Sequence, residues 1–195
     1  MKYFKKMIGK RIYLSPLSME DVETFTGWVN DLEIAKNLIF VSSVYSLEKE
    51  KEILSSMSKG TPQNIVMGII ETSTDKLIGS CGLHGIDHIN RTAEYGIMIG
   101  DKEYHSKGFG TEAAKLILDF GFNILNLHSI HLKVYSFNHR AISSYQKVGF
   151  KEFGRRREAK IIGGKKYDEV CMDILSSEFE SVYVTKIMES NNGHP

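Results

Sequence analysis

Cysteine and proline are scarce in this sequence of 195 residues, which contains two cysteines and three prolines. Cys81 and Cys171 cannot build a dense disulfide framework, and their spacing does not match that of a zinc site. A reducing, cytoplasmic environment is the simplest inference from so few cysteines. No internal repeat and no linker rich in proline or glycine divides the chain. The length therefore predicts a single domain over 1–195, with a core over 11–175 and a C-terminal tail over 176–195.

A charge excess and long apolar runs are absent as well. Lysine and arginine number 25 against 24 aspartate and glutamate residues, which gives a formal net charge of +1. This balance indicates neither a nucleic acid nor a polycation as partner. No apolar run approaches the roughly 20 residues needed to cross a bilayer, and no apolar segment follows the basic start as in a signal peptide. We therefore expect a cytoplasmic protein without a membrane or nucleic acid partner.

The hydrophobic pattern predicts an α+β fold. A strand at 11–16 precedes a helix that Ser18 caps, and Ser46 caps a second helix at 47–57. The charged run of this second helix, 48–52, predicts a solvated helix face. Alternating strands are then expected at 64–71, 77–86 and 92–100, as an antiparallel meander. A helix–strand–helix segment and a closing hairpin follow, at 109–125, 129–135, 138–148, 150–156 and 166–175. A meander followed by such a segment predicts a mixed sheet flanked by helices, and the last residues, 190–195, are expected to fray.

Two glycines separated by one residue open the longest predicted helix. The first N–H groups of a helix have no intrahelical partner and, together with the helix dipole, form a site for an anion such as a pyrophosphate. Gly108 and Gly110 allow the backbone to approach such a ligand closely, and Lys107 adds positive charge. The predicted cradle consists of His105, Ser106, Lys107, Gly108, Phe109 and Gly110.

Other interpretations of this stretch fit less well or stay open. A Walker A loop needs Lys-Ser or Lys-Thr directly after its second glycine, whereas Thr111-Glu112 follows Gly110. The stretch 108–113 matches the G-x-G-x-x-A dinucleotide fingerprint, but it follows a meander and no acidic residue ends the next predicted strand. Glycine at a helix start can also form a simple turn.

The stretch 103–114 resembles the CoA-binding motif of the GNAT superfamily of N-acetyltransferases, whose usual form is Q/R-x-x-G-x-G/A. His105 stands where this family usually has Gln, Arg or an aromatic residue. Downstream, the stretch 138–150 is similar to the family signature N-x-x-A…Y-x-K-x-G-F, through Asn138, Ala141, Tyr145, Lys147, Gly149 and Phe150. The resemblance extends from Ile12 to Leu175, and the nearest branch looks like the ribosomal-protein N-terminal and spermidine acetyltransferases.

This resemblance implies the GNAT fold, a mixed and mostly antiparallel sheet flanked by helices, with acetyl-CoA as co-substrate and no metal. It also implies that the strand before the cradle separates from its parallel neighbour and offers free backbone groups to the pantetheine. The residues implied to bind acetyl-CoA are Met98, Ile99, Gly100, His105, Ser106, Lys107, Gly108, Phe109, Gly110, Thr111 and Asn138. Asn138 is expected to cap the following helix as well.

The resemblance further implies direct attack of a primary amine on the acetyl thioester, through a tetrahedral intermediate. Tyr145 matches the family's general acid, and its hydroxyl is a neutral donor at pH 7. Glu94, on the strand that leads to the cradle, is the candidate base that takes the proton of the amine directly or through water. A non-catalytic acyl-CoA-binding sensor is the alternative.

The sequence leaves the acceptor open among a polyamine, a protein N-terminus and a small amine. A polyamine site should present carboxylates to a multiply charged cation. The segment 34–45, which we expect to line the acceptor side, is nearly uncharged and favours a partly apolar acceptor. The seven histidines are scattered and predict no metal site, and the branch resembled here commonly forms homo-oligomers.

Overall fold

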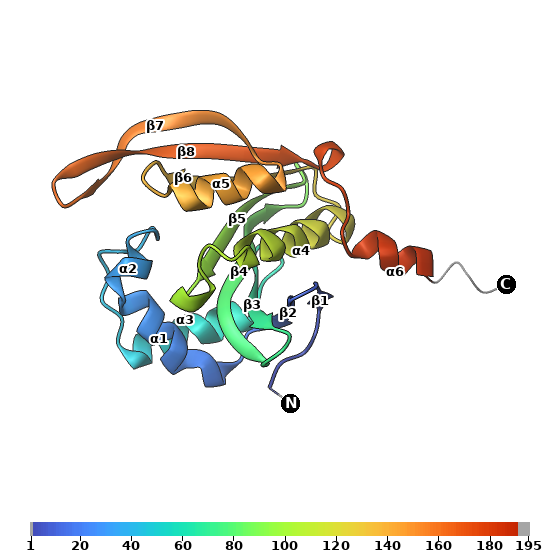
Figure 1. The fold of residues 1–195 in the computed structure, drawn as a ribbon, viewed down its shortest axis with the longest axis horizontal. Helices are drawn as coiled ribbons and strands as arrows, with labels where there is room; N and C mark the ends of the chain where they lie inside the picture. The colour runs from blue at the N-terminus through green and yellow to red at the C-terminus, as the bar shows by residue number, and fades with distance from the viewer. Residues whose placement is uncertain (1, 191–195) are drawn as a thin grey trace.

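The computed structural model describes residues 2–190, in which one mixed sheet forms the centre of the molecule (Figure 1). Its strands are β1 (Met7–Ile8), β2 (Ile12–Pro16), β3 (Ile65–Glu71), β4 (Lys76–Asp87), β5 (Thr92–Ile99), β6 (Ser129–Tyr135), β7 (Lys151–Ile162) and β8 (Lys165–Leu175). They lie in the order β1-β2-β3-β4-β5-β6-β8-β7, and every neighbouring pair is antiparallel except β5–β6. The expected α+β class, with a mixed and mostly antiparallel sheet, is confirmed.

The helices cover both faces of the sheet. They are α1 (Val22–Asn30), α2 (Leu32–Ala35), α3 (Leu47–Lys59), α4 (Phe109–Asn123), α5 (His139–Val148) and α6 (Val184–Ser190), with short 3-10 turns η1 (Met19–Asp21), η2 (Lys102–Tyr104) and η3 (Ser176–Glu178). The hydrophobic pattern predicted most of the long elements to within a few residues at each end. The strand predicted at 150–156 was too short, since β7 extends to Ile162 beyond an irregular register between Arg156 and Lys160. The pattern did not predict β1, α2 or α6, because elements of two to seven residues are too short to show a period.

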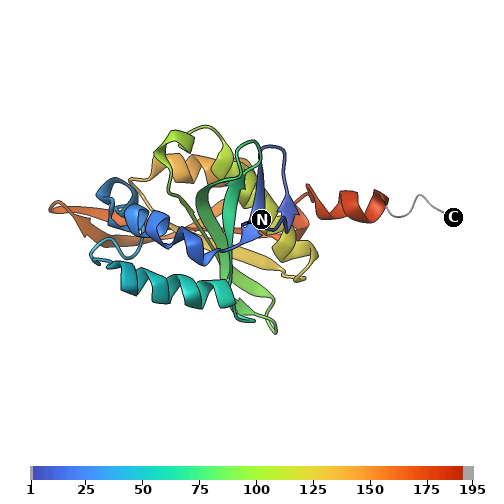
Figure 2. The ribbon, with the colours of Figure 1, turned by 90° about the horizontal axis from the view of Figure 1, so that it is seen from below.

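Two hydrophobic cores lie on opposite faces of the sheet. The larger core packs α4 and α5 on one face, and the smaller core packs α1 and α3 on the other (Figure 2). Strand β5 contributes to both, since its side chains alternate: Tyr95, Ile97 and Ile99 belong to the first core and Met98 to the second. The alternation that the sequence predicted for β5 is therefore confirmed.

The sheet forks between its two parallel strands. Strands β5 and β6 pair only at their first residues, where Thr92, Ala93 and Glu94 lie opposite Ser129, Ile130 and His131. Beyond Glu94 the two strands diverge, and β5 continues toward the start of α4 while β6 stays with the β7–β8 hairpin (Figure 1). The predicted separation of these strands is thus present.

The C-terminal segment continues beyond the predicted core. After β8 the chain passes through η3 and packs Phe179, Val182, Tyr183 and Val184 against the larger core. The expected fraying concerns mainly residues 191–195, which lie outside the described residues. Within 2–190, no helix has both the length and the apolarity to cross a bilayer.

Candidate active site

The edge of β5 that faces the fork carries free backbone groups. The Gly100 N–H donates to the Ile78 carbonyl of β4 at 3.0 Å, and Met98 lies opposite Ser80 two residues earlier in the same register. Because backbone groups of an antiparallel pair alternate in direction, those of Ile97 and Ile99 point away from β4 into the fork. The expectation of free backbone groups is therefore wrong for Gly100 and, by the same alternation, for Met98. Ile97, which the sequence analysis did not name, faces the fork instead.

Gly100 is required for a different reason. A Cβ atom at this position would lie 2.0 Å from the indole ring of Trp28, so any side chain would displace α1 from the end of β5. Trp28 in turn packs edge-on against Phe25, with ring centroids 5.4 Å apart. Gly100 thus lets the helix of one face close onto the strand that borders the fork.

The predicted cradle forms the N-terminus of α4, at the mouth of the fork. Gly108 is the N-cap residue and has φ +85° and ψ 0°, in the left-handed region that glycine adopts most readily. No side chain caps the helix, and the N–H groups of Phe109, Gly110 and Thr111 have no hydrogen-bond partner within residues 2–190. These donors and the helix dipole together form an anion site.

Side chains from both ends of the loop hold it in this shape. Glu112 accepts from the backbone N–H groups of Lys10 and Arg11 at 2.7 and 2.8 Å, and from Arg11 Nε at 3.0 Å. Arg11 Nη1 donates to the Lys107 carbonyl at 2.9 Å. His105 Nε2 lies 2.8 Å from the Ile99 carbonyl, which ties the loop back to β5. The cradle is therefore anchored before a ligand arrives.

Tyr145 lies in the fork on the side of α5. It lines a cavity of about 930 Å³ that passes between β5 and β6, and burial raises the pKa of its phenol to about 12. Its ring packs edge-on against Tyr95 and Phe150, with centroids 6.0 and 5.9 Å away. A phenol with its pKa raised in this way keeps its proton at neutral pH, so Tyr145 can donate a hydrogen bond to a ligand in the cavity.

A second tyrosine hydroxyl in the same place lacks a partner. Tyr95 is 3% exposed and its hydroxyl makes no hydrogen bond within the described residues, although it lines the cavity. Buried hydroxyls are nearly always hydrogen-bonded. A partnerless one in a cavity indicates that a ligand completes it.

Glu94 lies on the opposite face of β5, toward α1 and α3. Its carboxylate is 3.2 Å from Lys133 Nζ and 3.7 Å from His131 Nε2, both on β6. Directly across the β4–β5 ladder stands His84, which also lines the cavity. Burial lowers the pKa of His84, although the charge of Glu94 opposes this, so its imidazole is neutral at pH 7.

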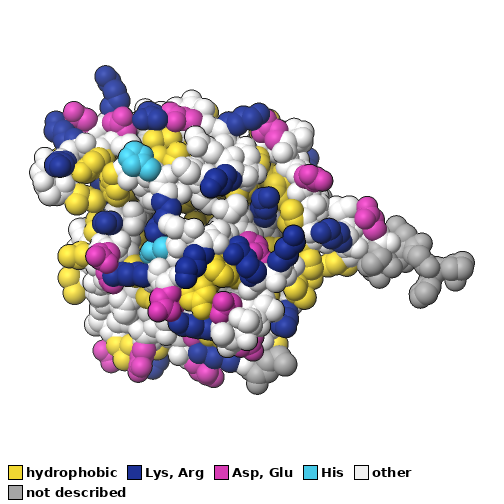
Figure 3. All heavy atoms as spheres, in the orientation of Figure 1, with side chains coloured by type: hydrophobic (Ala, Val, Ile, Leu, Met, Phe, Trp, Pro, Cys, Tyr) yellow, Lys and Arg dark blue, Asp and Glu magenta, His cyan; other side chains and the backbone are white. Residues whose placement is uncertain are grey.

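Asn138 and a set of basic residues surround the entrance. Asn138 accepts from the Ala141 N–H at 3.2 Å and so caps α5, as expected. A smaller hollow of about 410 Å³ adjoins the main cavity and is lined by Glu33, Lys36, Asn37, Lys102, His105, Phe137, Asn138, His139 and Arg140. Figure 3 shows Lys and Arg side chains gathered across the middle of this face. Cations in excess of carboxylates at this entrance favour an anionic ligand.

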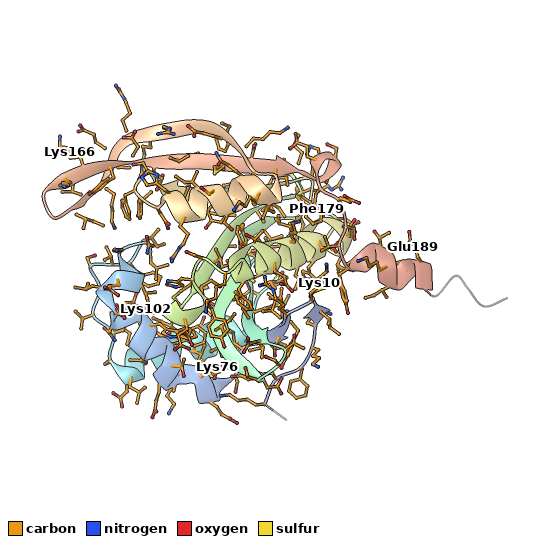
Figure 4. The ribbon with its side chains drawn as sticks, in the orientation of Figure 1. Lys10, Lys76, Lys102, Lys166, Phe179 and Glu189 are labelled. Carbon is orange, nitrogen blue, oxygen red and sulfur yellow. The ribbon has the colours of Figure 1, made fainter. Side chains whose placement is uncertain are left out.

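Lys102 is one of the residues that line this entrance. It forms an ion pair with Asp31 at 2.7 Å and another with Glu33, and so joins the end of β5 to α2 (Figure 4). Because α2 was not predicted, neither was this connection. The residues that the sequence analysis missed at the site are Ile97, Tyr95, His84 and Glu50, and only the pattern of the β5 strand could have pointed to the first two.

The structure brings most of the predicted site residues to one cavity between β5 and β6. Its lining includes Tyr145, Glu94, Met98, Ile99, Asn138 and, from the cradle and the start of α4, His105, Ser106, Gly108, Gly110 and Thr111. Gly100, Lys107 and Phe109 do not line it, and Phe109 packs in the core instead. Among the clusters of His, Cys, Asp and Glu in residues 2–190, none has the geometry to hold a metal ion.

A mixed sheet that forks beside an uncapped helix N-terminus defines the acetyltransferase class. The chain matches the acetyltransferase (GNAT) domain family over residues 11–151, and it belongs to that family. It is an enzyme, an N-acetyltransferase that acts on an amine. The resemblance stated from the two motifs is thus confirmed, and no relative supports a non-catalytic sensor.

Several relatives illustrate this membership. The spermidine N(1)-acetyltransferase of Escherichia coli K12 is 35% identical over 117 residues, which cover 60% of this chain and 62% of that protein. YdaF of Bacillus subtilis, named provisionally as a ribosomal N-acetyltransferase, is 31% identical over 182 residues, covering 91% and 98%. The crystal structure of spermidine N-acetyltransferase from Vibrio cholerae with CoA and spermine superposes with a TM-score of 0.79, at 28% identity over 87% of this chain and 98% of that one.

Proposed function

We propose that this enzyme transfers the acetyl group of acetyl-CoA to a primary amine that attacks the thioester directly at the fork of the sheet. The observation that carries the proposal is the fork itself, with the free N–H groups of α4 at its mouth and Tyr145 inside it. The donor enters from the face of α4 and α5, and the amine from the face of α1 and α3. Both meet where β5 and β6 separate.

The residues present fit the donor. The free N–H groups of Phe109, Gly110 and Thr111 would hold its pyrophosphate. The backbone groups of Ile97 and the N–H of Ile99, whose carbonyl is bound by His105, would pair with the pantetheine amides. The Tyr95 hydroxyl, which has no partner in the described residues, would gain one beside the thioester. Acetyl-CoA supplies an activated acyl group, and the chain supplies orientation and the two proton transfers.

Tyr145 would protonate the departing thiolate. Tyr145 is half-buried and lines the cavity, and the raised pKa keeps its phenol protonated at neutral pH, so that its proton is available to the sulfur as the C–S bond breaks. Glu94 would accept the proton of the incoming ammonium, directly or through water. The neutral imidazole of His84, opposite Glu94 on β4, is the second group that this geometry allows as acceptor.

The role of Glu94 is tested by Glu94→Gln. If this carboxylate is the base, kcat/KM at pH 7 falls roughly 100-fold or more, and the decline of kcat/KM toward acid pH disappears because no carboxylate remains to be protonated. The measurement is the pH profile of CoA release, with His84→Gln measured in parallel. An unaltered profile for Glu94→Gln would exclude Glu94, and loss of the acid limb in His84→Gln alone would transfer the role to His84.

The cradle is tested by Gly108→Val. Valine is strained at φ +85°, and its Cβ would lie 3.3 Å from Arg11 Nη2, so the loop must change shape. Affinity for CoA, measured by calorimetry, is expected to fall at least roughly 100-fold, the loss of about 3 kcal/mol of phosphate binding. The control is Gly163→Val, at φ +58° in open space in the β7–β8 turn, which carries a similar strain away from the fork. Equal CoA affinities in the two variants would contradict the assignment.

We also propose a cytoplasmic location and a homo-oligomeric state. The location rests on Cys81 and Cys171, which are both free thiols. The oligomeric state rests on the branch to which the motifs are similar, and size-exclusion chromatography with light scattering tests it. The proposed reaction uses acetyl-CoA as co-substrate and requires no metal.

A further inference from the structure

Glu50 occupies an inward position on α3. It begins a stripe that continues with Ile53, Leu54 and Met57, at the spacing of one helix face, and all four residues line the cavity. Glu50 is 4% exposed, while its charged neighbours from Glu48 to Glu52 are exposed. The prediction of a solvated face for this run is therefore wrong for Glu50, because the 3.6-residue period places it among the apolar residues.

The carboxylate of Glu50 has no partner in the described part of the chain. No hydrogen bond or ion pair reaches its side chain, and burial raises the pKa of the carboxyl without any opposing charge. The other carboxylates that line the cavity differ, since Glu94 is 3.2 Å from Lys133 and Glu169 is 3.5 Å from Arg156. The Glu50 carboxylate oxygens are not sealed in the core but open onto the cavity. A carboxylate with little exposure and no cation beside it favours a ligand that brings a positive charge.

The walls around Glu50 are apolar. They come from α1, the segment between α2 and α3, α3 itself and two strands, and they include Phe25, Leu38, Phe40, Leu54, Val66 and Met98. Phe40 and Tyr45 pack edge-on with centroids 5.6 Å apart. A charge in the middle of an acceptor would be desolvated against these walls without compensation.

The positive residues of the cavity lie elsewhere. Arg140 and Lys147 belong to α5, on the donor side of the fork, and Lys133 of β6 is paired with Glu94 at 3.2 Å. A second ammonium group on the acceptor would be repelled there and attracted to Glu50. Helix α3 packs over β3, two strands from β5, which is roughly 10 Å at the usual strand spacing. Glu50 therefore lies too far from the fork to contact the reacting amine and would contact another group of the acceptor.

We propose that the acceptor is an amphipathic diamine, with one amine at the fork, an uncharged body against the apolar walls, and a second ammonium held by Glu50. The inference rests on the proposed acetyl transfer for the reacting end only. It separates this enzyme from one built for a polyamine, whose internal ammonium would meet the apolar walls.

Three amines of equal chain length test the proposal. In 1,8-diaminooctane a methylene replaces the internal ammonium of spermidine, and in nonylamine a methyl group also replaces one terminal ammonium. We expect kcat/KM for CoA release to be highest for 1,8-diaminooctane. Glu50→Gln should lower kcat/KM for 1,8-diaminooctane roughly 30-fold or more, mainly by raising KM. The kcat/KM for nonylamine should stay within about twofold of the wild-type value. Glu52→Gln, on the exposed face of the same helix, is the matched control.

A thermal-shift titration with the same amines separates the two proposals. If 1,8-diaminooctane stabilises the wild-type chain and this effect is lost in Glu50→Gln, the acceptor site is supported. If in addition no amine is acetylated, only the proposed reaction is contradicted. Spermidine as the best substrate, or equal effects of Glu50→Gln on diamine and monoamine, would overturn the diamine inference and leave the acetyl transfer intact. Because Gln preserves the shape and removes an unpartnered acid, the variant is expected to fold.

Discussion

Tyr145→Phe will reduce kcat roughly 100- to 10,000-fold, the range that loss of a general acid produces. The substitution removes one oxygen and keeps the ring, so packing against Tyr95 and Phe150 is preserved. The thiolate would then leave without a proton donor. The measurement is single-turnover CoA release at saturating acetyl-CoA, with CoA affinity determined separately and expected to stay within about threefold.

The pH dependence of this variant sharpens the test. Because burial raises the pKa of Tyr145 to about 12, its proton is fully present below that pH and is lost only as the pH rises through about 12. Titration of Tyr145 should therefore not affect kcat between pH 7 and 10. The pH profiles of the wild type and Tyr145→Phe should have the same shape over this range. Tyr183→Phe, on the C-terminal segment, serves as the control for a tyrosine hydroxyl away from the fork. Near-equal kcat for Tyr145→Phe and the wild type would remove Tyr145 from the reaction.

Asp119→Ala will lower the free energy of unfolding by about 2–4 kcal/mol, since it removes a fully buried carboxylate with several donors. Asp119 accepts from the N–H groups of Val182, Tyr183 and Val184 at 3.0, 2.6 and 3.1 Å. It also accepts from Ser181 Oγ at 2.8 Å and from Asn123 Nδ2 at 2.7 Å. Without it, three backbone donors at the start of α6 lose their partner.

Urea unfolding and hydrogen exchange measure this effect. We expect the amides of 182–184 to lose protection first, because they donate to this carboxylate. Phe179, just before them, lies beside the end of α4 (Figure 4) and packs on Phe122. Asn123→Ala is the control, since it removes one donor and leaves the contacts with the C-terminal segment, and it should cost less than about 1 kcal/mol. A loss of similar size in both variants would show that Asp119 does not anchor the segment.

The acceptor side shows where sequence patterns mislead. Five consecutive charged residues, Glu48 to Glu52, look like a solvated surface, and four of them are. The direction of Glu50 follows from the period of α3, but its lack of a partner depends on α1, the loop before α3 and the sheet. The local sequence pattern of α3 carries no information about these distant elements. In contrast, the apolar character expected for the segment 34–45 is present in the cavity wall.

The candidate catalytic residues divide in the same way. The downstream motif pointed to Tyr145, the resemblance of the preceding strand pointed to Glu94, and both line one cavity. The neutral imidazole of His84 beside Glu94 arises from cross-strand register and burial, which no spacing in the sequence reveals. The same register turns the backbone of Met98 and Gly100 toward β4 and that of Ile97 and Ile99 toward the fork.

Local features of this protein follow directly from neighbouring residues. The extents of the long helices and strands, the uncapped start of α4 at Gly108 and the Asn138 cap all arise within a few residues of chain, through periodicity and the unpaired N–H groups of a helix end. The tertiary structure decided which charges lose water and which find partners. Within residues 2–190 the Glu50 carboxylate and the Tyr95 hydroxyl have no partner, whereas Asp119 gains partners from a segment distant in sequence. Desolvation and pairing depend on the packed environment of a side chain, and that environment exists only once the sheet has formed.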